Sequence, residues 1–261
     1  MSRFWIWAAG LLLLSIWLVW VGQRWIFPEL GYHWNPERLG QWGDTFGALN
    51  ALFAAAGFSA VLITLWFQQR QIESAQNEQH RQRFESSYFE LLRLRREARD
   101  AIKFRHSKEY NEAKKLRYGP LMTFEGQDAF RAGMVEIRHW LQVSESKGAG
   151  KTELAELYRA KIHSRYESKL GPYFRLMYTI LQRISEDPVL SEAEKIRYGN
   201  LLRSQITSHE AAMAGLNGLS PVSKDFSRLV TEFRLLKYLP NGKMRRTLEA
   251  HYPPEAFKER D

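Results

Sequence analysis

Residues 43–67 read GDTFGALNALFAAAGFSAVLITLWF, and this stretch decides the fold. After Asp44 it carries no formal charge as far as Phe67. As an α-helix it is roughly 30 Å long, at about 1.5 Å per residue, which matches the hydrocarbon core of a bilayer. A second uncharged run, residues 4–21, precedes it. The two runs predict a transmembrane hairpin, with spans at about 4–22 and 46–67 and an external loop at 23–45.

The composition is basic and lacks cysteine. The formal net charge is +9 over 261 residues. The absence of cysteine excludes disulfides, thiolate metal sites and cysteine nucleophiles. Excess Lys and Arg fits either nucleic-acid phosphates or the anionic surface of a membrane. With a membrane hairpin predicted, the lipid bilayer is the favoured partner, and direct nucleic-acid binding is the less favoured alternative.

The distribution of arginine predicts the orientation of the hairpin. The loop between the runs contains only Arg24 and Arg38. Arginines are dense after Phe67, at Arg70, Arg81, Arg83, Arg93, Arg95, Arg96 and Arg99. By the positive-inside rule both termini lie in the cytoplasm. We therefore expect a two-pass protein of the bacterial inner membrane.

Small residues recur along one face of the second span, at Gly47, Ala51, Ala55 and Ser59. This spacing lets another helix approach closely. The partner helix is either the first span of the same chain or a neighbouring protomer, which would make a homo-oligomer. Asp44 is expected to be the N-cap of this span, and Asn50 to hydrogen-bond across helices.

The remainder of the chain predicts helices and no strands, so the fold class is all-α. We expect a juxtamembrane stalk helix at 68–105, a cytoplasmic helical domain at 106–240 and a loose, charged tail at 241–261. The stalk has an apolar seam that is interrupted at Arg95.

Helix boundaries inside the domain follow from apolar spacing and breakers. A helix is expected at 127–143, and another opens at 170–172 and ends at 187–188. Ser191 and Glu194 form a predicted capping box for a third helix, which continues through Ile206. A break is expected at 215–221, followed by a final helix at 226–239.

Several segments together resemble the putative phage abortive infection family, putAbiC. In the membrane region these are Gly43, Asp44, Phe46, Gly47, Asn50 and Phe53. In the cytoplasmic part the most recognisable block contains Tyr173, Phe174 and Arg175, followed by Tyr198, Arg203, Gln205 and Glu210. The resemblance covers residues 43–239, and it departs from the family pattern at Pro172 and around 211–217.

The resemblance implies membrane-anchored antiphage defence, in which infection triggers arrest or death of the host cell. Similar two-span proteins act as effectors beside a separate sensor, such as a retron reverse transcriptase with its nucleic acid. Tyr173 and Phe174 are interpreted as helix-packing residues and not as a ligand platform.

An enzymatic alternative rests on histidine. All-α ribonucleases of the HEPN type carry an Arg followed at short spacing by a His, and Arg203 with His209 fits that spacing. Arg99 with His106 also fits it but is ranked second, and Arg203 could instead pair with Glu210. In such a pair the His transfers protons and the Arg stabilises phosphate charge. The other histidines lack metal-ligand spacing, so no metal or cofactor is expected.

The favoured hypothesis is thus a membrane-disrupting or growth-arresting effector without catalytic residues. The alternatives are a membrane-tethered ribonuclease and a non-enzymatic membrane sensor or scaffold.

Overall fold

The computed structural model describes residues 11–19, 36–116, 122–145 and 151–259. Two compact units are present, residues 1–73 and 74–261, and each is treated by itself. The described residues are almost entirely helical, which confirms the all-α class. The two strands among them, β1 (Lys103–Phe104) and β2 (Phe124–Glu125), form one antiparallel pair in which Phe104 faces Phe124.

The longest element is α2, Pro36–Asp100, a single helix of 65 residues. Proline suits the first turn of a helix, because its fixed φ is already helical and its missing N–H needs no partner there. Residues 36–45 are therefore helical, and the loop expected at 23–45 is wrong over this part; residues 20–35 lie outside the described residues. Asp44 lies roughly two turns inside α2, so the prediction that it caps the helix is also wrong.

The apolar part of α2 is exposed along its whole length. Among the described residues one helix is long and apolar enough to cross a membrane, Leu49–Asp100, with a best mean hydropathy of 1.8. Its large apolar side chains between Leu49 and Phe67 are 46% to 66% exposed. The predicted first span is described only at residues 11–19, which are helical and exposed; its other residues lie outside the described ranges. The second span thus has the predicted helical form, and the hairpin stays a prediction.

The last turns of α2 belong to the core of the domain. Phe84, Tyr88 and Leu92 are buried on one face. The Tyr88 hydroxyl donates to the carbonyl of Tyr198 at 2.7 Å, and the Tyr198 hydroxyl donates to Glu85 at 2.7 Å. The predicted stalk at 68–105 therefore does not stand apart from the domain, and its helix ends at Asp100.

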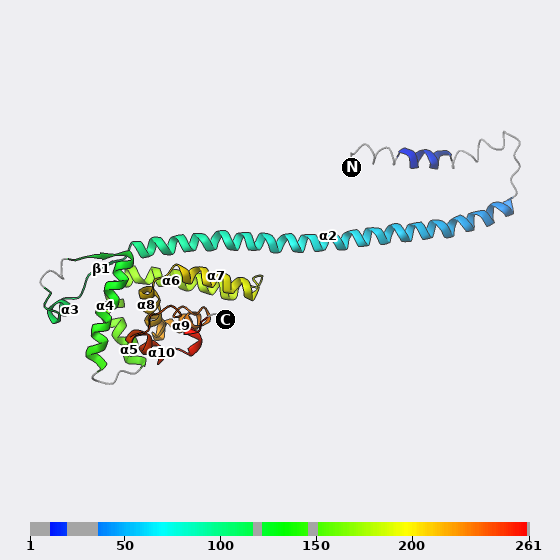
Figure 1. Ribbon diagram of the computed structural model, residues 1–261. Coiled ribbons are helices and arrows are strands. Elements are labelled where there is room, and N and C mark those ends of the chain that lie inside the picture. Colours follow the sequence, from blue (N-terminus) through cyan, green and yellow to red (C-terminus); the bar gives the residue numbers. More distant parts are fainter. Residues whose placement is uncertain (1–10, 20–35, 117–121, 146–150, 260–261) are drawn as a thin grey trace. The chain divides into compact units, whose positions relative to one another are not determined.

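The domain is a bundle of short helices around one core (Figure 1). Its elements after β1 are α3 (Lys108–Ala113), α4 (Gly126–Glu145), α5 (Lys151–Tyr158), the π-helical turn η2 (Arg159–His163), α6 (Ser164–Glu186), α7 (Glu192–Ser204), α8 (Ser208–Gly218), η3 (Pro221–Ser223), α9 (Lys224–Glu232), α10 (Lys243–Glu249) and η4 (Pro254–Phe257). Helix α8 is buried on nearly all sides, and α4, α5, α9 and α10 pack against it.

Helix α6 begins earlier than the sequence suggested. It starts at Ser164 and contains Pro172 in its interior, so the expected start at 170–172 is wrong. The backbone of Tyr166 is not helical, with φ −127° and ψ 22°, and the regular helix restarts after it. Pro172 is the sixth residue after Tyr166, in the second turn of the restarted helix, where its missing N–H removes one intrahelical hydrogen bond. The predicted end holds, because Asp187 is the C-cap.

Two capping boxes define α7 and α8. The box of Ser191 and Glu194 is confirmed. A second box, Thr207 with Glu210, starts α8, so the helix predicted to run from Ser191 through Ile206 ends at Ser204.

The expected break at 215–221 is wrong for Gly215, since α8 continues to Gly218. The packing at Gly215 is tight, because an added Cβ would lie 3.0 Å from Leu236 Cδ2.

The C-terminal residues are folded into the domain. Helix α9 ends at Glu232 and turns follow, with Arg234 in the left-handed region at φ 51°, so the expected helix at 226–239 is too long. Beyond it, α10 and η4 bury Leu248, Tyr252 and Ala256. The Tyr252 hydroxyl donates to the carbonyl of Gly215 at 2.8 Å. The prediction of a loose tail at 241–261 is wrong, because its few apolar side chains complete the core around α8.

Candidate functional site

The most unusual group in the domain is a buried cluster of Arg95, Tyr173 and Glu210. All three side chains are fully buried. They come from α2, α6 and α8 respectively. The Tyr173 hydroxyl donates to Glu210 Oε1 at 2.8 Å, and Arg95 Nη1 donates to the same hydroxyl at 3.2 Å. Arg95 Nη1 lies 3.7 Å from Glu210 Oε1, which makes a buried ion pair.

Local structure fixes the carboxylate of this cluster. Glu210 is the third residue of α8, and its Oε2 accepts from the backbone N–H of Thr207 at 2.7 Å as part of the capping box. Arg95 Nη2 reaches the carbonyl of Gln205 at 3.4 Å, at the end of α7. The cluster therefore joins α2 to the junction of α7 and α8.

The cluster is built for structure and not for catalysis. Burial raises the pKa of the Tyr173 hydroxyl well above its ordinary value, and the negative charge of Glu210 raises it further. The tyrosine therefore stays neutral and acts as a donor between two ions. No part of the three side chains is exposed, so none can meet a substrate in this state. We conclude that the cluster fixes the position of α2 in the domain.

A second buried carboxylate, Glu136 on α4, holds the segment around β1 and α3. Its side chain is completely buried. It accepts hydrogen bonds from His106 Nδ1 at 3.0 Å, the Ser107 N–H at 3.1 Å and Arg165 Nη1 at 2.7 Å. Burial alone would raise the pKa of the Glu136 carboxyl, but the bonds from His106 and Ser107 and the charge of Arg165 hold it below its ordinary value.

Because the pKa of Glu136 is lowered in the folded state, the stability of the fold depends on pH. A carboxyl with a lower pKa in the folded state stabilises the fold above its unfolded pKa of about 4.3, and this contribution is lost as the pH falls through the folded value. Glu136→Gln should reduce the free energy of unfolding at pH 7 by about 1 to 3 kcal/mol, and should also flatten its decline below about pH 5. Denaturant unfolding of the full chain between pH 7 and pH 4 measures both effects.

The matched control for this prediction is Glu156→Gln. Glu156 is exposed and pairs with Arg159 on the same helical surface at 3.0 Å. Such a pair contributes little, so this variant should follow the wild-type pH profile. An equally steep acid transition in Glu136→Gln and in the wild type would contradict the role assigned to Glu136.

The residues of the cytoplasmic family motif divide between core and surface. Phe174 and Tyr198 are buried, which agrees with the interpretation of Tyr173 and Phe174 as packing residues. Arg175 is exposed and lies 3.5 Å from Glu167. The carbonyl of Gln205 accepts from Arg95, as described above.

The two proposed ribonuclease pairs are engaged elsewhere. Arg203 is buried, and its guanidinium donates to the carbonyl of Phe233 at 3.1 Å and to Asn200 Oδ1 at 2.6 Å. Glu210, the suggested partner of Arg203, bonds to Tyr173 and Thr207.

The histidines of those pairs have other neighbours. The charges acting on His209 are those of Arg138 and Arg131 on α4 and of Glu210. Arg99 pairs with the adjacent Asp100 at 2.9 Å, whereas His106 binds Glu136.

The membrane-helix residues are all on the exposed part of α2. Gly47, Ala51, Ala55 and Ser59 are exposed, and no described atom lies within 4 Å of a Cβ built at Gly47 or Gly43. The Ser59 hydroxyl bonds the carbonyl of Ala55 at 2.8 Å, within its own helix. Phe46 and Asn50 are also exposed. The contact face is therefore available, and its partner stays a prediction.

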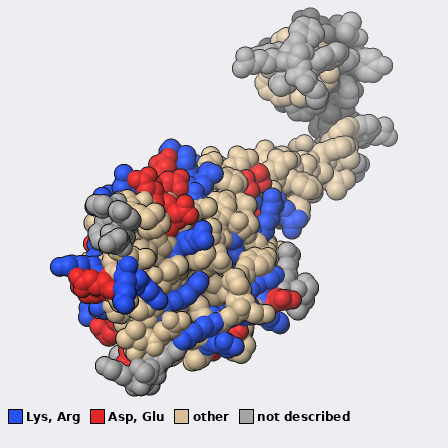
Figure 2. Space-filling model, turned by 60° about the vertical axis from the view of Figure 1, so that its left-hand side comes forward, with Lys and Arg blue, Asp and Glu red and all other residues tan. Residues whose placement is uncertain are grey.

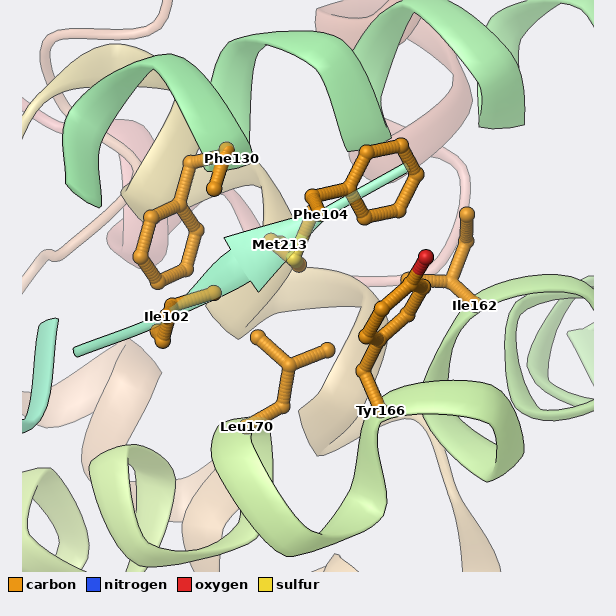
Figure 3. Close-up of a pocket in the computed structure, with 8 residues that line it drawn as sticks. Ile102, Phe104, Phe130, Ile162, Tyr166, Leu170 and Met213 are labelled. Atoms are coloured by element: carbon orange, nitrogen blue, oxygen red, sulfur yellow. The ribbon is translucent and has the colours of Figure 1, made fainter. Parts of the chain in front are cut away.

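One cavity in the described part of the domain is small and apolar. An apolar cavity of about 10 Å³ lies between β1, α4, α6 and α8 (Figure 3), lined by Ile102, Phe104, Ala129, Phe130, Ile162, Tyr166, Leu170 and Met213. This volume is about the smallest that holds one water. The described residues also contain no group of three or more His, Asp or Glu side chains placed to hold a metal ion.

The sequence carried signals for part of this arrangement. Arg95 interrupts an apolar seam, which indicates a buried charge with a partner. The order Thr207-x-x-Glu210 is a capping-box pattern that marks the start of α8. Nothing local, however, pairs Arg95 with Glu210, or His106 with Glu136, because these partners are far apart in the sequence.

Comparison with known proteins gives one match. Neither the curated proteins nor the solved structures include one similar to this chain. The model of the putAbiC family, described as "Putative phage abortive infection protein", matches residues 165–244. The matched segment contains α6 to α9, and with them Tyr173, Arg203 and Glu210. Over residues 165–244 the chain is thus similar to the putative phage abortive infection proteins, and the resemblance is confirmed for this segment.

Proposed function

We propose that this protein is a membrane-anchored effector of abortive infection, which disturbs the inner membrane or arrests the cell when a phage infects. The family match supports the link to abortive infection. The observation that carries the membrane role is the uncharged part of α2, where the large apolar side chains from Leu49 to Phe67 are 46% to 66% exposed. An exposed apolar surface of this length is costly in water and favourable in lipid.

In this proposal the first apolar run forms a second span, and both termini lie in the cytoplasm. The domain controls the membrane segment, and a separate sensor releases it. The sensor is a partner of the kind that accompanies similar effectors, such as a reverse transcriptase with its nucleic acid. The small-residue face of α2 joins protomers into an oligomer.

The test follows the membrane potential of infected cells that express the full chain. Filling the small-residue face by Ala51→Leu with Ala55→Leu should keep the protein in the membrane, abolish the loss of potential during infection and remove protection. The bulky side chains prevent the close approach of helices that small residues allow. A potential-sensitive dye and phage plating measure the two effects.

Gly57→Leu is the matched control, since it adds the same side chain on the opposite face of α2, where no described atom lies within 4 Å. This variant should behave as the wild type. If wild-type cells are protected while their membrane potential stays intact throughout infection, the membrane-disruption proposal is wrong. Protection that survives the Leu substitutions would reject the contact face instead.

A further inference from the structure

Helix α4 directs two arginines to the surface of the domain. Its inner face is buried, and it exposes Arg131, Val135 and Arg138. The two arginines are seven residues apart, which is about two helical turns or roughly 10 Å. They therefore form a short strip on one side of the helix.

These two arginines differ from many others on the domain in having no ion pair. Several other arginines pair with a carboxylate three or four residues away: Arg93 with Glu97, Arg159 with Glu156, Arg228 with Glu232 and Arg245 with Glu249. Figure 2 shows Lys and Arg interspersed with Asp and Glu on the face that it presents. Within the described residues no carboxylate pairs with Arg131 or Arg138, so both charges are available to a partner.

Helix α8 adds a third group to the strip. The two helices approach closely at Gly133, where an added Cβ would lie 2.9 Å from the terminal methyl of Met213. His209 lies one turn before Met213 and is partly buried. Burial lowers the pKa of His209, and the charges of Arg138 and Arg131 lower it further against the opposing effect of Glu210. The imidazole is thus neutral near pH 7, and the charges of both guanidinium groups act on it.

We infer that Arg131, Arg138 and His209 form a binding surface for the phosphates of a single-stranded nucleic acid. The planar guanidinium group matches a phosphate through two parallel hydrogen bonds. A strip of roughly 10 Å spans about three stacked nucleotides of one strand. The exposed side chain of Val135 lies between the arginines and offers an apolar contact. This inference does not depend on what α2 does in a membrane.

A lipid surface fits this strip less well. Basic segments that bind anionic membranes present clusters of about four to eight Lys and Arg. Helix α4 has only Arg131 and Arg138, with Asp128 in its first turn. Two guanidinium groups and an imidazole at fixed spacing suit a few phosphates of one strand.

The test measures binding of fluorescein-labelled oligouridylate, about 15 nucleotides long, to the full chain in neutral phosphatidylcholine nanodiscs. Arg131→Gln and Arg138→Gln should each weaken binding on the order of tenfold, the size of one charge-assisted hydrogen bond. Each should also reduce the slope of log Kd against log salt by about 1. His209→Ala should weaken binding more at pH 6 than at pH 8, because a phosphate favours the protonated imidazole.

Arg228→Gln is the matched control, since it removes the same charge from an exposed arginine that is paired with Glu232 at 2.8 Å. It should change the affinity by less than about twofold. The inference is overturned if the wild type does not bind the oligonucleotide, or if the control weakens binding as much as the α4 variants do. It is also overturned if the α4 double variant binds RNA normally but loses binding to phosphatidylglycerol vesicles, which would assign the strip to lipid. Unchanged thermal unfolding of the variants verifies that the fold is intact.

Discussion

Glu210→Gln is expected to lower the free energy of unfolding of the domain by about 3 to 5 kcal/mol. The substitution leaves the guanidinium of Arg95 fully buried without a counter-charge. A domain of this size is stabilised by only about 5 to 15 kcal/mol, so the variant should unfold at a much lower denaturant concentration. Denaturant titration of the full chain in detergent, followed by tryptophan fluorescence and limited proteolysis, measures the change.

A double variant separates the effect of the two buried charges from the effect of the volume that the side chains fill. Replacing both charges, by Arg95→Met with Glu210→Met, should restore part of the stability, because no unpaired charge then stays buried. Glu90→Gln is the control: Glu90 is exposed and pairs with Arg93 on the same helix, so its loss should change stability by less than about 1 kcal/mol. A cost below about 1 kcal/mol for Glu210→Gln would show that the cluster does not hold α2.

Phe58→Lys is expected to prevent insertion of α2. A lysine at the centre of a span costs about 2.5 to 3.5 kcal/mol, which shifts the insertion equilibrium on the order of 100-fold. Phe58 is exposed in the middle of the uncharged part of α2. Gln76→Lys places the same charge on an exposed part of α2 beyond the apolar stretch and should have no effect.

The absence of cysteine provides the measurement. Ala75→Cys introduces a single thiol, which a membrane-impermeant maleimide cannot reach in intact cells if it lies in the cytoplasm. In the Phe58→Lys background the thiol should become reachable, or the chain should be extracted from the membrane by carbonate. The prediction is wrong if the thiol stays protected and the chain stays in the membrane. In that case α2 tolerates the charge and is not the span.

The sequence was sufficient for features that depend on neighbouring residues. Apolar spacing and the capping pattern located α4 and the start of α7, since each rests on contacts within a turn. The start of α2 was misplaced because Asp44 is a good capping residue, whereas Pro36 is an equally good first residue further upstream. The start of α8 was missed although Thr207 and Glu210 form the same pattern as Ser191 and Glu194.

The candidate sites depended on contacts that no local pattern encodes. Arg203 and His209 are close in sequence, but the end of α7 directs Arg203 to Phe233 and the start of α8 brings His209 towards α4. The last residues looked like a charged tail because their apolar side chains are sparse. Leu248 and Tyr252 nevertheless complete the core around Gly215, which only the packing of α8 reveals.

The bonds of α2 to distant helices have a consequence for the order of events during synthesis. Arg95 meets the carbonyl of Gln205 and Tyr88 meets that of Tyr198, each across 110 residues of chain. At about 5 to 20 residues per second, a ribosome needs roughly 5 to 20 s to make that interval. The apolar part of α2 thus leaves the ribosome well before the domain that holds its end can fold. If it inserts as proposed, each new molecule reaches the membrane before its own control domain exists, and a chain truncated before Glu210 never acquires that control.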